Sequence, residues 1–174
     1  MKSLISVAII FVASFSANAW SAGASPDALL ANEIRAGCTL RVVKYNIQPA
    51  DFDKYDLSLN WQCADHEQAI VDTYLSSNSD GESRPEIETV FYTKSRDVIV
   101  LVKWDENYKD TKAARYKVFA YRYVGDISDT SFVKMDRLSR NFGDGYDGIL
   151  NGKRTDFSFK TAAAIRKRLA ELGD

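Results

Sequence analysis

The sequence has few of the residues that most often carry metal or catalytic chemistry. Its 174 residues include one histidine, His66, and two cysteines, Cys38 and Cys63. Any Ser/His/Asp triad or metal–histidine cluster would have to use His66, and no GxSxG, HExxH, CxxC or GxxxxGK[ST] motif accompanies it. His66 stands in the polar segment 64–67, which is typical of a solvated turn. We therefore expect no cofactor and favour a protein that is not an enzyme.

An excess of charge of either sign is also absent. The chain has 23 Lys and Arg against 24 Asp and Glu, for a net charge of -1. With 45% hydrophobic and 27% charged residues, its composition is that of an ordinary globular protein. The balance provides no general attraction to nucleic acid or to a membrane surface. We expect no nucleic-acid partner.

Only one long apolar run is present, from Leu4 to about Phe15. It is too short to span a bilayer, which takes about 20 residues, and it is followed by the small residues Ala17 and Ala19 in an A-x-A pattern. This pattern predicts a cleaved secretory signal over residues 1–19 and a single globular domain over residues 20–174. The protein should be periplasmic or secreted, without stable membrane insertion.

The two cysteines lie at matching positions of two alternating segments. In YDLSLNWQC, residues 55–63, the apolar residues fall on one face and end at Cys63, and CTLRVV begins the same alternation at Cys38. If the segments pair antiparallel with the cysteines opposite each other, Leu40 lies opposite Trp61 and both apolar faces align. In an oxidising compartment this arrangement predicts a disulfide. The rival interpretations are a reactive thiol beside His66 and a metal site formed by Cys38, Cys63 and His66.

The remaining pattern predicts an α+β fold. Strands are expected over 68–77, 86–93, 97–104 and 114–124, with a charged loop over 105–112 and a short strand leading into a helical turn over 131–142. The run 98–102 is apolar throughout, as in a strand covered on both faces near the centre of a sheet. Asn151-Gly152 predicts a type I′ hairpin, and 160–173 has the spacing of an amphipathic helix. Together with a short helix from Ser25 to Gly37, these elements predict a single mainly antiparallel sheet of about 6 to 7 strands with a helix at each end.

Two groups of residues are candidates for a binding surface. Alternate aromatic residues of the segment 114–124 lie on one face, where they are either core beneath a helix or an exposed interface. Basic residues accumulate toward the C-terminus, where they form either a solvated face or a dock for an anionic partner. The candidate binding residues are Phe119, Tyr121, Tyr123, Lys153, Arg154, Arg166 and Arg168.

The glycine-rich segment NFGDGYDGILNG concentrates oxygen ligands at Asp144, Asp147 and Asn151. Such residues occur in calcium loops, but their spacing does not follow the D-x-D-x-D-G pattern with a terminal glutamate. The same residues also suit a tight hairpin turn. A weak calcium site remains an alternative to a purely structural turn.

A signal peptide, one disulfide, a compact antiparallel sheet and no catalytic motif together favour a protective binding protein. Immunity proteins, inhibitors and self-resistance proteins against a toxin or antibiotic have this general profile, and they act by occlusion. The expected partner is a protein such as a toxin or cell-wall enzyme, or a small antibiotic-like ligand, and a homodimer is a further candidate because exposed strands pair readily. The alternatives are a small envelope hydrolase, which would use His66 or the 144–147 loop, and a structural component of an envelope complex.

Overall fold

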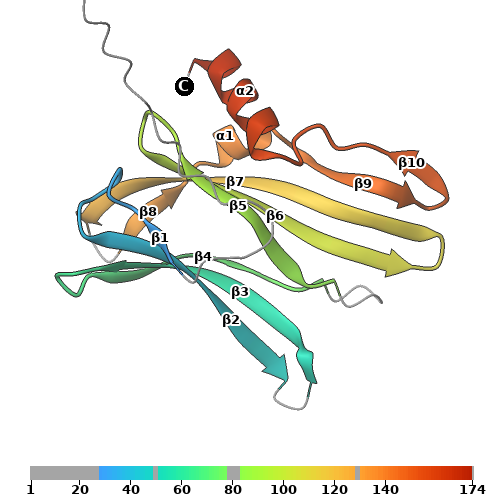
Figure 1. Cartoon of the computed structure of the whole chain (residues 1–174), viewed down its shortest axis with the longest axis horizontal. Helices are drawn as coiled ribbons and strands as arrows, with labels where there is room; N and C mark the ends of the chain where they lie inside the picture. The colour runs from blue at the N-terminus through green and yellow to red at the C-terminus, as the bar shows by residue number, and fades with distance from the viewer. Residues whose placement is uncertain (1–27, 49–50, 78–82, 128–129, 174) are drawn as a thin grey trace, which may run out of the picture.

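The computed structural model describes residues 28–48, 51–77, 83–127 and 130–173. Within these residues the chain forms two antiparallel sheets of four and six strands and two short helices (Figure 1). The predicted α+β fold with a single sheet of about 6 to 7 strands is therefore wrong. The predicted signal segment, residues 1–19, lies outside the described part of the chain.

The first sheet, called sheet 1 below, has the strand order β1-β2-β3-β4. Its strands are β1 (Leu29–Leu30), β2 (Cys38–Gln48), β3 (Asp51–Cys63) and β4 (Gln68–Tyr74). The register predicted for β2 and β3 is confirmed, with Leu40 opposite Trp61. Cys38 and Cys63 lie opposite each other and form the predicted disulfide. The apolar alternation and the cysteine positions therefore specify the same pairing.

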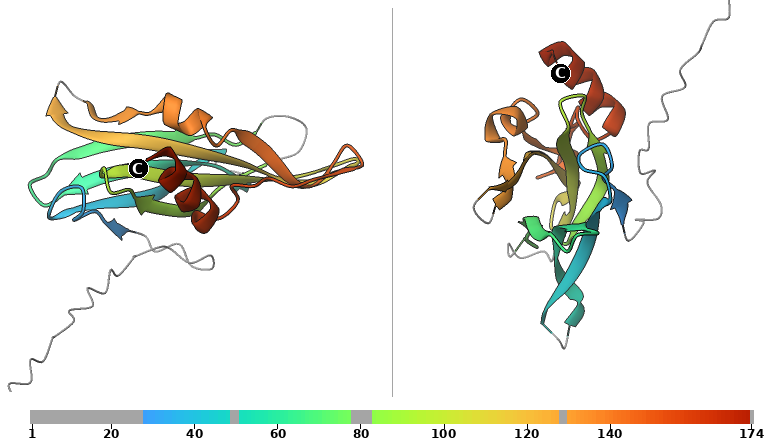
Figure 2. Two further views of the ribbon diagram at one scale, coloured as in Figure 1. Left: turned by 90° about the horizontal axis from the view of Figure 1, so that it is seen from above. Right: turned by 90° about the vertical axis from the view of Figure 1, so that its left-hand side faces the viewer.

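The second sheet, called sheet 2, has the order β10-β9-β7-β6-β5, and β8 pairs with the last part of β7. Its strands are β5 (Pro85–Tyr92), β6 (Asp97–Tyr108), β7 (Thr111–Ile127), β8 (Thr130–Lys134), β9 (Asp144–Leu150) and β10 (Lys153–Thr155). The helices are α1 (Asp136–Arg140) and α2 (Ala162–Leu172). Both lie on the face of sheet 2 that points away from sheet 1 (Figures 1 and 2).

Two hydrophobic cores explain why the strands divide into two sheets. The inner face of sheet 1 packs against one face of sheet 2, which buries residues such as Leu59, Trp61 and Val100. The opposite face of sheet 2 packs against the helices, which buries Ile99 and Ile165 among others. A single sheet would have left the apolar face of β2 and β3 without a partner layer, and its exposure to water is unfavourable.

The prediction for residues 98–102 is confirmed. This part of β6 alternates between the two cores, with Val98, Val100 and Val102 between the sheets and Ile99 and Leu101 beneath the helices. All five side chains are fully buried. A strand covered on both faces needs no polar alternation, and this strand holds the two layers together.

The predicted N-terminal helix is wrong over its described part. Leu29 and Leu30 form β1 and pair with the start of β2, and a turn follows in which the backbone N–H of Ile34 donates to the carbonyl of Ala31. Leu29 and Ile34 are buried, but Leu30 is exposed. Pairing with β2 therefore overrides the weak local helix signal.

The C-terminal helix agrees with its prediction. Thr161 caps α2 by accepting a hydrogen bond from the N–H of Ala164 at 3.2 Å, and Gly173 ends the helix in the left-handed conformation with φ 90°. Ile165 and Leu169 are buried against sheet 2. The amphipathic pattern identified the buried side of this helix, but not the sheet that it covers.

One of the predicted turns is wrong and another is confirmed. The charged segment 105–112 was expected as a loop, but β6 and β7 continue until Tyr108 pairs with Thr111. Its charged side chains are accommodated because this long hairpin extends into solvent (Figure 2). Asn151 and Gly152 have φ values of 50° and 73°, as a type I′ turn between β9 and β10 requires.

Candidate functional site

The predicted aromatic row does not form an exposed surface. Phe119 and Tyr121 of β7 are buried, with exposed fractions of 8% and 1%, because odd-numbered residues of β7 point toward sheet 1. Tyr123 is half-buried, with its ring 5.2 Å from that of Trp61. The row is therefore core between the two sheets, and its interpretation as a docking surface is corrected.

A buried hydrogen-bond network crosses between the sheets at Tyr121. Its hydroxyl donates to Asp72 Oδ2 at 2.6 Å and lies 3.1 Å from the hydroxyl of Tyr74. Lys134 of β8 donates to the same Asp72 oxygen at 2.7 Å. Burial raises the pKa of both phenols above their ordinary value. The network therefore ties β4 of sheet 1 to β7 and β8 of sheet 2.

A second cluster between the sheets is centred on Glu67, which the sequence analysis did not single out. Its Oε1 accepts hydrogen bonds from Trp61 Nε1 at 3.1 Å and from Ser131 Oγ at 2.9 Å, and its Oε2 pairs with Arg35. The carboxyl group is thus satisfied by both sheets. This arrangement fits a structural role, since it fixes the turn before β4 against β8.

The same turn contains a group that resembles a metal site, formed by Cys63, Asp65 and Glu67. The sulfur of Cys63 is already bonded to Cys38, so it is not available as a thiolate ligand. Both carboxylates pair with the Arg35 guanidinium. His66, in this turn, is exposed and has φ 73°, which agrees with the expected turn histidine.

The structure does not bring the predicted basic residues together. Lys153 and Arg154 are exposed on β10, at the far end of the β9–β10 hairpin, while Arg166 and Arg168 belong to α2 (Figures 1 and 2). Arg166 lies 4.4 Å over the ring of Phe91, and Arg168 pairs with Glu171 at 3.1 Å. These residues therefore do not form one basic patch.

The candidate calcium ligands are also separated. Asp144 lies opposite Lys117 and Asp147 opposite Ala114, so their side chains point to opposite faces of sheet 2. Lys160 donates to Asp147 at 2.8 Å, and Asn151 Oδ1 accepts from the Thr111 hydroxyl at 3.5 Å. The oxygen atoms do not converge on one point, and the turn explains these residues without an ion.

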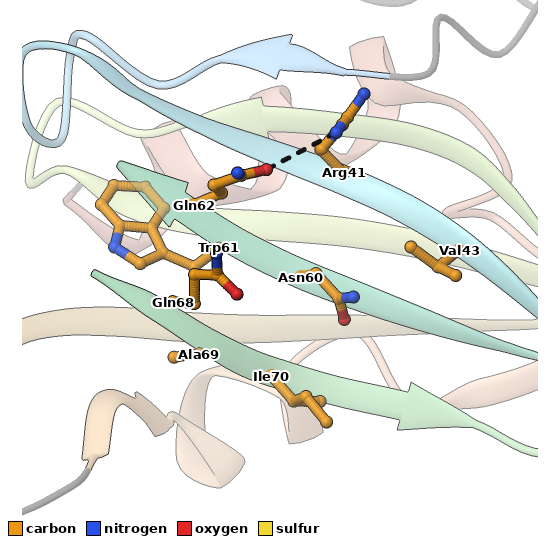
Figure 3. Close-up of a pocket in the computed structure, with 8 residues that line it drawn as sticks. All are labelled: Arg41, Val43, Asn60, Trp61, Gln62, Gln68, Ala69 and Ile70. Atoms are coloured by element: carbon orange, nitrogen blue, oxygen red, sulfur yellow. Dashed lines mark hydrogen bonds between the residues drawn. The ribbon is translucent and has the colours of Figure 1, made fainter. Parts of the chain in front are cut away.

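The outer face of sheet 1 points away from sheet 2, and neither of the described helices packs on it (Figures 1 and 2). It carries the polar half of the β3 alternation, which is not among the binding residues expected from the sequence. A shallow groove of about 330 Å³ crosses this face over β2, β3 and β4 (Figure 3). Its lining residues are Arg41, Val43, Asn60, Trp61, Gln62, Gln68, Ala69 and Ile70.

The groove, called the amide groove below, has a distinct chemistry. Asn60, Gln62 and Gln68 each offer a carbonyl acceptor and an NH₂ donor, and Arg41 donates to the Gln62 carbonyl at 3.5 Å. Ile70 has 65% of its surface exposed, so it offers an apolar contact beside these polar groups. The groove thus combines hydrogen-bonding groups without net negative charge and an exposed apolar contact.

Tyr45 extends this face along β2. The residue is 45% exposed, and its hydroxyl accepts a hydrogen bond from Ser58 at 3.4 Å. Hydrogen bonds from Ser58 and Asn60 lower the pKa of the Tyr45 phenol. The tyrosine is therefore held in place beside the amide groove, with part of its ring open to solvent.

Comparison with known proteins provides no family for this chain. The sequence matches no protein-family model, and no curated protein or solved structure is significantly similar to it. Among the residues that the structure describes, neither helix has the length and apolar character needed to cross a membrane. The functional interpretation therefore depends on the geometry of the amide groove and its surroundings.

Proposed function

We propose that the chain is a protective binding protein of the periplasm or extracellular space that acts without catalysis. It binds a toxin or a cell-wall enzyme through the outer face of sheet 1 and blocks that partner's own site. The observation that carries this proposal is the amide groove, which lies on the sheet face that the helices leave open. The disulfide at one end of this sheet fits an oxidising compartment.

The shape of the groove favours a protein partner over a small antibiotic-like ligand. Small-molecule sites are usually concave and bury most of the ligand surface, whereas this groove is open along a sheet. Amide side chains match the alternating donors and acceptors of a polypeptide backbone. Arg41 and Tyr45 are residue types that are enriched at protein interfaces.

The framework around the groove supports the same interpretation. The disulfide joins β2 to β3, and the Asp72 and Glu67 clusters tie sheet 1 to sheet 2. A face that is rigid before binding loses less conformational freedom when a partner docks. Tight occlusion of a partner therefore does not require this sheet to rearrange.

Capture with matched variants tests the proposal. The mature chain, residues 20–174, is tagged at its C-terminus and incubated with an oxidising periplasmic extract of its native cells, and bound proteins are identified by mass spectrometry. Wild type is compared with Ile70→Asp, which places a charge in the amide groove. The control is Ile149→Asp, which makes the same change at an exposed strand position of sheet 2.

We expect wild type and Ile149→Asp to capture one partner in stoichiometric amount. Ile70→Asp should capture at least tenfold less of it. Equimolar wild-type protein should then inhibit the activity of the purified partner. Equal capture by Ile70→Asp would contradict the assigned face. A captured enzyme that keeps its full activity would contradict occlusion, and substrate turnover by the chain itself would support the hydrolase alternative.

A further inference from the structure

The tips of two hairpins lie side by side at one end of sheet 2 (Figure 1). One tip joins β6 to β7, and the other, Asn151-Gly152, joins β9 to β10. Leu150 pairs directly with Lys153, so the two turn residues lie beyond the ladder of their own hairpin. Their backbone N–H groups therefore need acceptors from elsewhere.

The neighbouring tip supplies both acceptors. The N–H of Gly152 donates to the carbonyl of Asp110 at 2.9 Å. The N–H of Asn151 donates to the Thr111 hydroxyl at 3.2 Å, and that hydroxyl donates to the carboxamide oxygen of the same asparagine at 3.5 Å. Thr111 is buried, whereas both turn residues are exposed. The docked tips thus hold the backbone and the side chain of an Asn-Gly turn that water can reach.

An Asn-Gly pair is chemically reactive, because glycine has no side chain to shield its backbone nitrogen. Asn151 is the only asparagine of the chain that precedes a glycine. In the reaction, the nitrogen of Gly152 loses its proton and attacks Cγ of Asn151, and a cyclic succinimide forms as ammonia leaves. Water then opens the ring at either carbonyl, which gives aspartate or isoaspartate. One water is consumed and one ammonia is released, without an oxidant or a cofactor.

The native turn opposes this reaction. The type I′ conformation directs the nitrogen of Gly152 away from Cβ of Asn151, so ring closure requires a large rotation about the Cα–C bond of the asparagine. That rotation breaks the hydrogen bond from Gly152 to Asp110. The attacking nitrogen must also lose the proton that this hydrogen bond holds. The reaction therefore requires the tip to open.

We propose that Asn151 is a site of spontaneous deamidation that the docked hairpin tips keep unreactive in the native protein. Local opening of the β9–β10 tip sets the rate, because ends of hairpins open more readily than the core. Isoaspartate carries the main chain through the side chain and lengthens it by one methylene group, so the two-residue turn cannot re-form after the reaction. The inference goes beyond the proposed function and concerns sheet 2 rather than the amide groove.

Peptide mapping by mass spectrometry tests the proposal on the purified mature chain at mildly alkaline pH. The conversion of Asn151 to aspartate and isoaspartate is followed with time in the native chain and in urea. We expect the native chain to react at least tenfold more slowly than the unfolded chain. Thr111→Val removes the hydroxyl that holds the turn but keeps a β-branched side chain, and it should accelerate the native reaction about fivefold.

Tyr121→Phe is the control, because it weakens the contact between the sheets and leaves both tips intact. This variant should react at Asn151 as slowly as wild type. Acceleration equal to that of Thr111→Val would overturn the proposal, since global rather than local opening would then control the reaction.

Hydrogen exchange provides a second readout, because the N–H of Gly152 should be protected in wild type and less protected in Thr111→Val. Three further results would overturn the proposal. They are a native reaction as fast as that in urea, a Thr111→Val variant that reacts like wild type, and an Asn151 that stays intact in the unfolded chain. All of these measurements use the purified chain alone, so failure of the partner-capture experiment would leave them unchanged.

Discussion

The hydroxyl of Tyr121 should contribute more to stability than its neighbour Tyr74, although both are buried in the same network. Tyr121 donates to the Asp72 carboxylate, so its own oxygen is the acceptor for the Tyr74 hydroxyl. Tyr121→Phe therefore removes one hydrogen bond to a charged group and leaves the Tyr74 hydroxyl without this partner. Tyr74→Phe removes only a neutral hydrogen bond.

The magnitudes follow from these partners. Loss of a hydrogen bond to a charged group costs about 1.5–3 kcal/mol, and an unsatisfied buried hydroxyl costs about 1–3 kcal/mol. Because Asp72 keeps Lys134, we expect Tyr121→Phe to lower the free energy of unfolding by about 3 kcal/mol. For Tyr74→Phe we expect about 1 kcal/mol. The double variant should lose about 1–2 kcal/mol less than the sum of the single variants, since it leaves no orphaned Tyr74 hydroxyl.

Urea unfolding at neutral pH, followed by tryptophan fluorescence, measures all three variants. Trp61 and Trp104 are buried between the sheets, so their emission reports the separation of the layers. The reasoning is refuted if Tyr74→Phe destabilises the protein as much as Tyr121→Phe does, or if the two changes are additive. Either result would mean that the hydroxyls are satisfied independently.

Two further predictions concern the disulfide and the response to alkaline pH. Replacing Cys38 and Cys63 by alanine removes a cross-link between residues that are 25 positions apart. In the chain-entropy model this lowers the free energy of unfolding, measured by urea titration, by about 3.5 kcal/mol. Burial raises the pKa of Tyr74 and Tyr121 above the unfolded value near 10, so both phenols stay protonated in the folded state. Their contribution to the free energy of unfolding is complete below about pH 10, where the unfolded phenols are also protonated. Above that pH the unfolded phenols ionise, so the free energy of unfolding falls by about 1.4 kcal/mol per pH unit for each phenol. Absorbance at the tyrosinate band should show these two groups ionising only with unfolding.

Contrary outcomes are clear for both predictions. A double alanine variant within about 1 kcal/mol of wild type would show that the disulfide hardly restricts the unfolded chain. Immediate ionisation of every tyrosine at alkaline pH, while the far-UV spectrum remains native, would contradict the burial of the network.

Local patterns in the sequence determined several parts of the fold. The alternation around Cys38 and Cys63 specified one register, because a shift by one residue would have turned an apolar face to water. Asn151-Gly152 specified a hairpin through its positive φ angles, and Thr161 began a helix through its hydroxyl cap. Each of these signals depends on a few neighbouring residues or on one strand pair, so it is readable without the rest of the chain.

The tertiary structure alone decided which layer covers each buried face. A period of two tells which side of β7 is apolar, but not whether a helix, a sheet or a partner lies over Phe119 and Tyr121. The extra residue at Val71, where the pairing of β3 with β4 shifts, turns Asp72 inward toward Tyr121. Such a bulge is set by two paired strands together, and neither strand signals it in sequence.

The same reasoning explains the candidate site. Asn60 and Gln62 belong to the solvent half of an alternating strand, and a polar residue looks the same in sequence whether or not a groove forms around it. The groove exists because β2 and β4 place Arg41 and Ile70 beside these amides, while the helices pack on the far side of sheet 2. Side-chain polarity is a property of each residue, but the open face results from the arrangement of the described strands and helices.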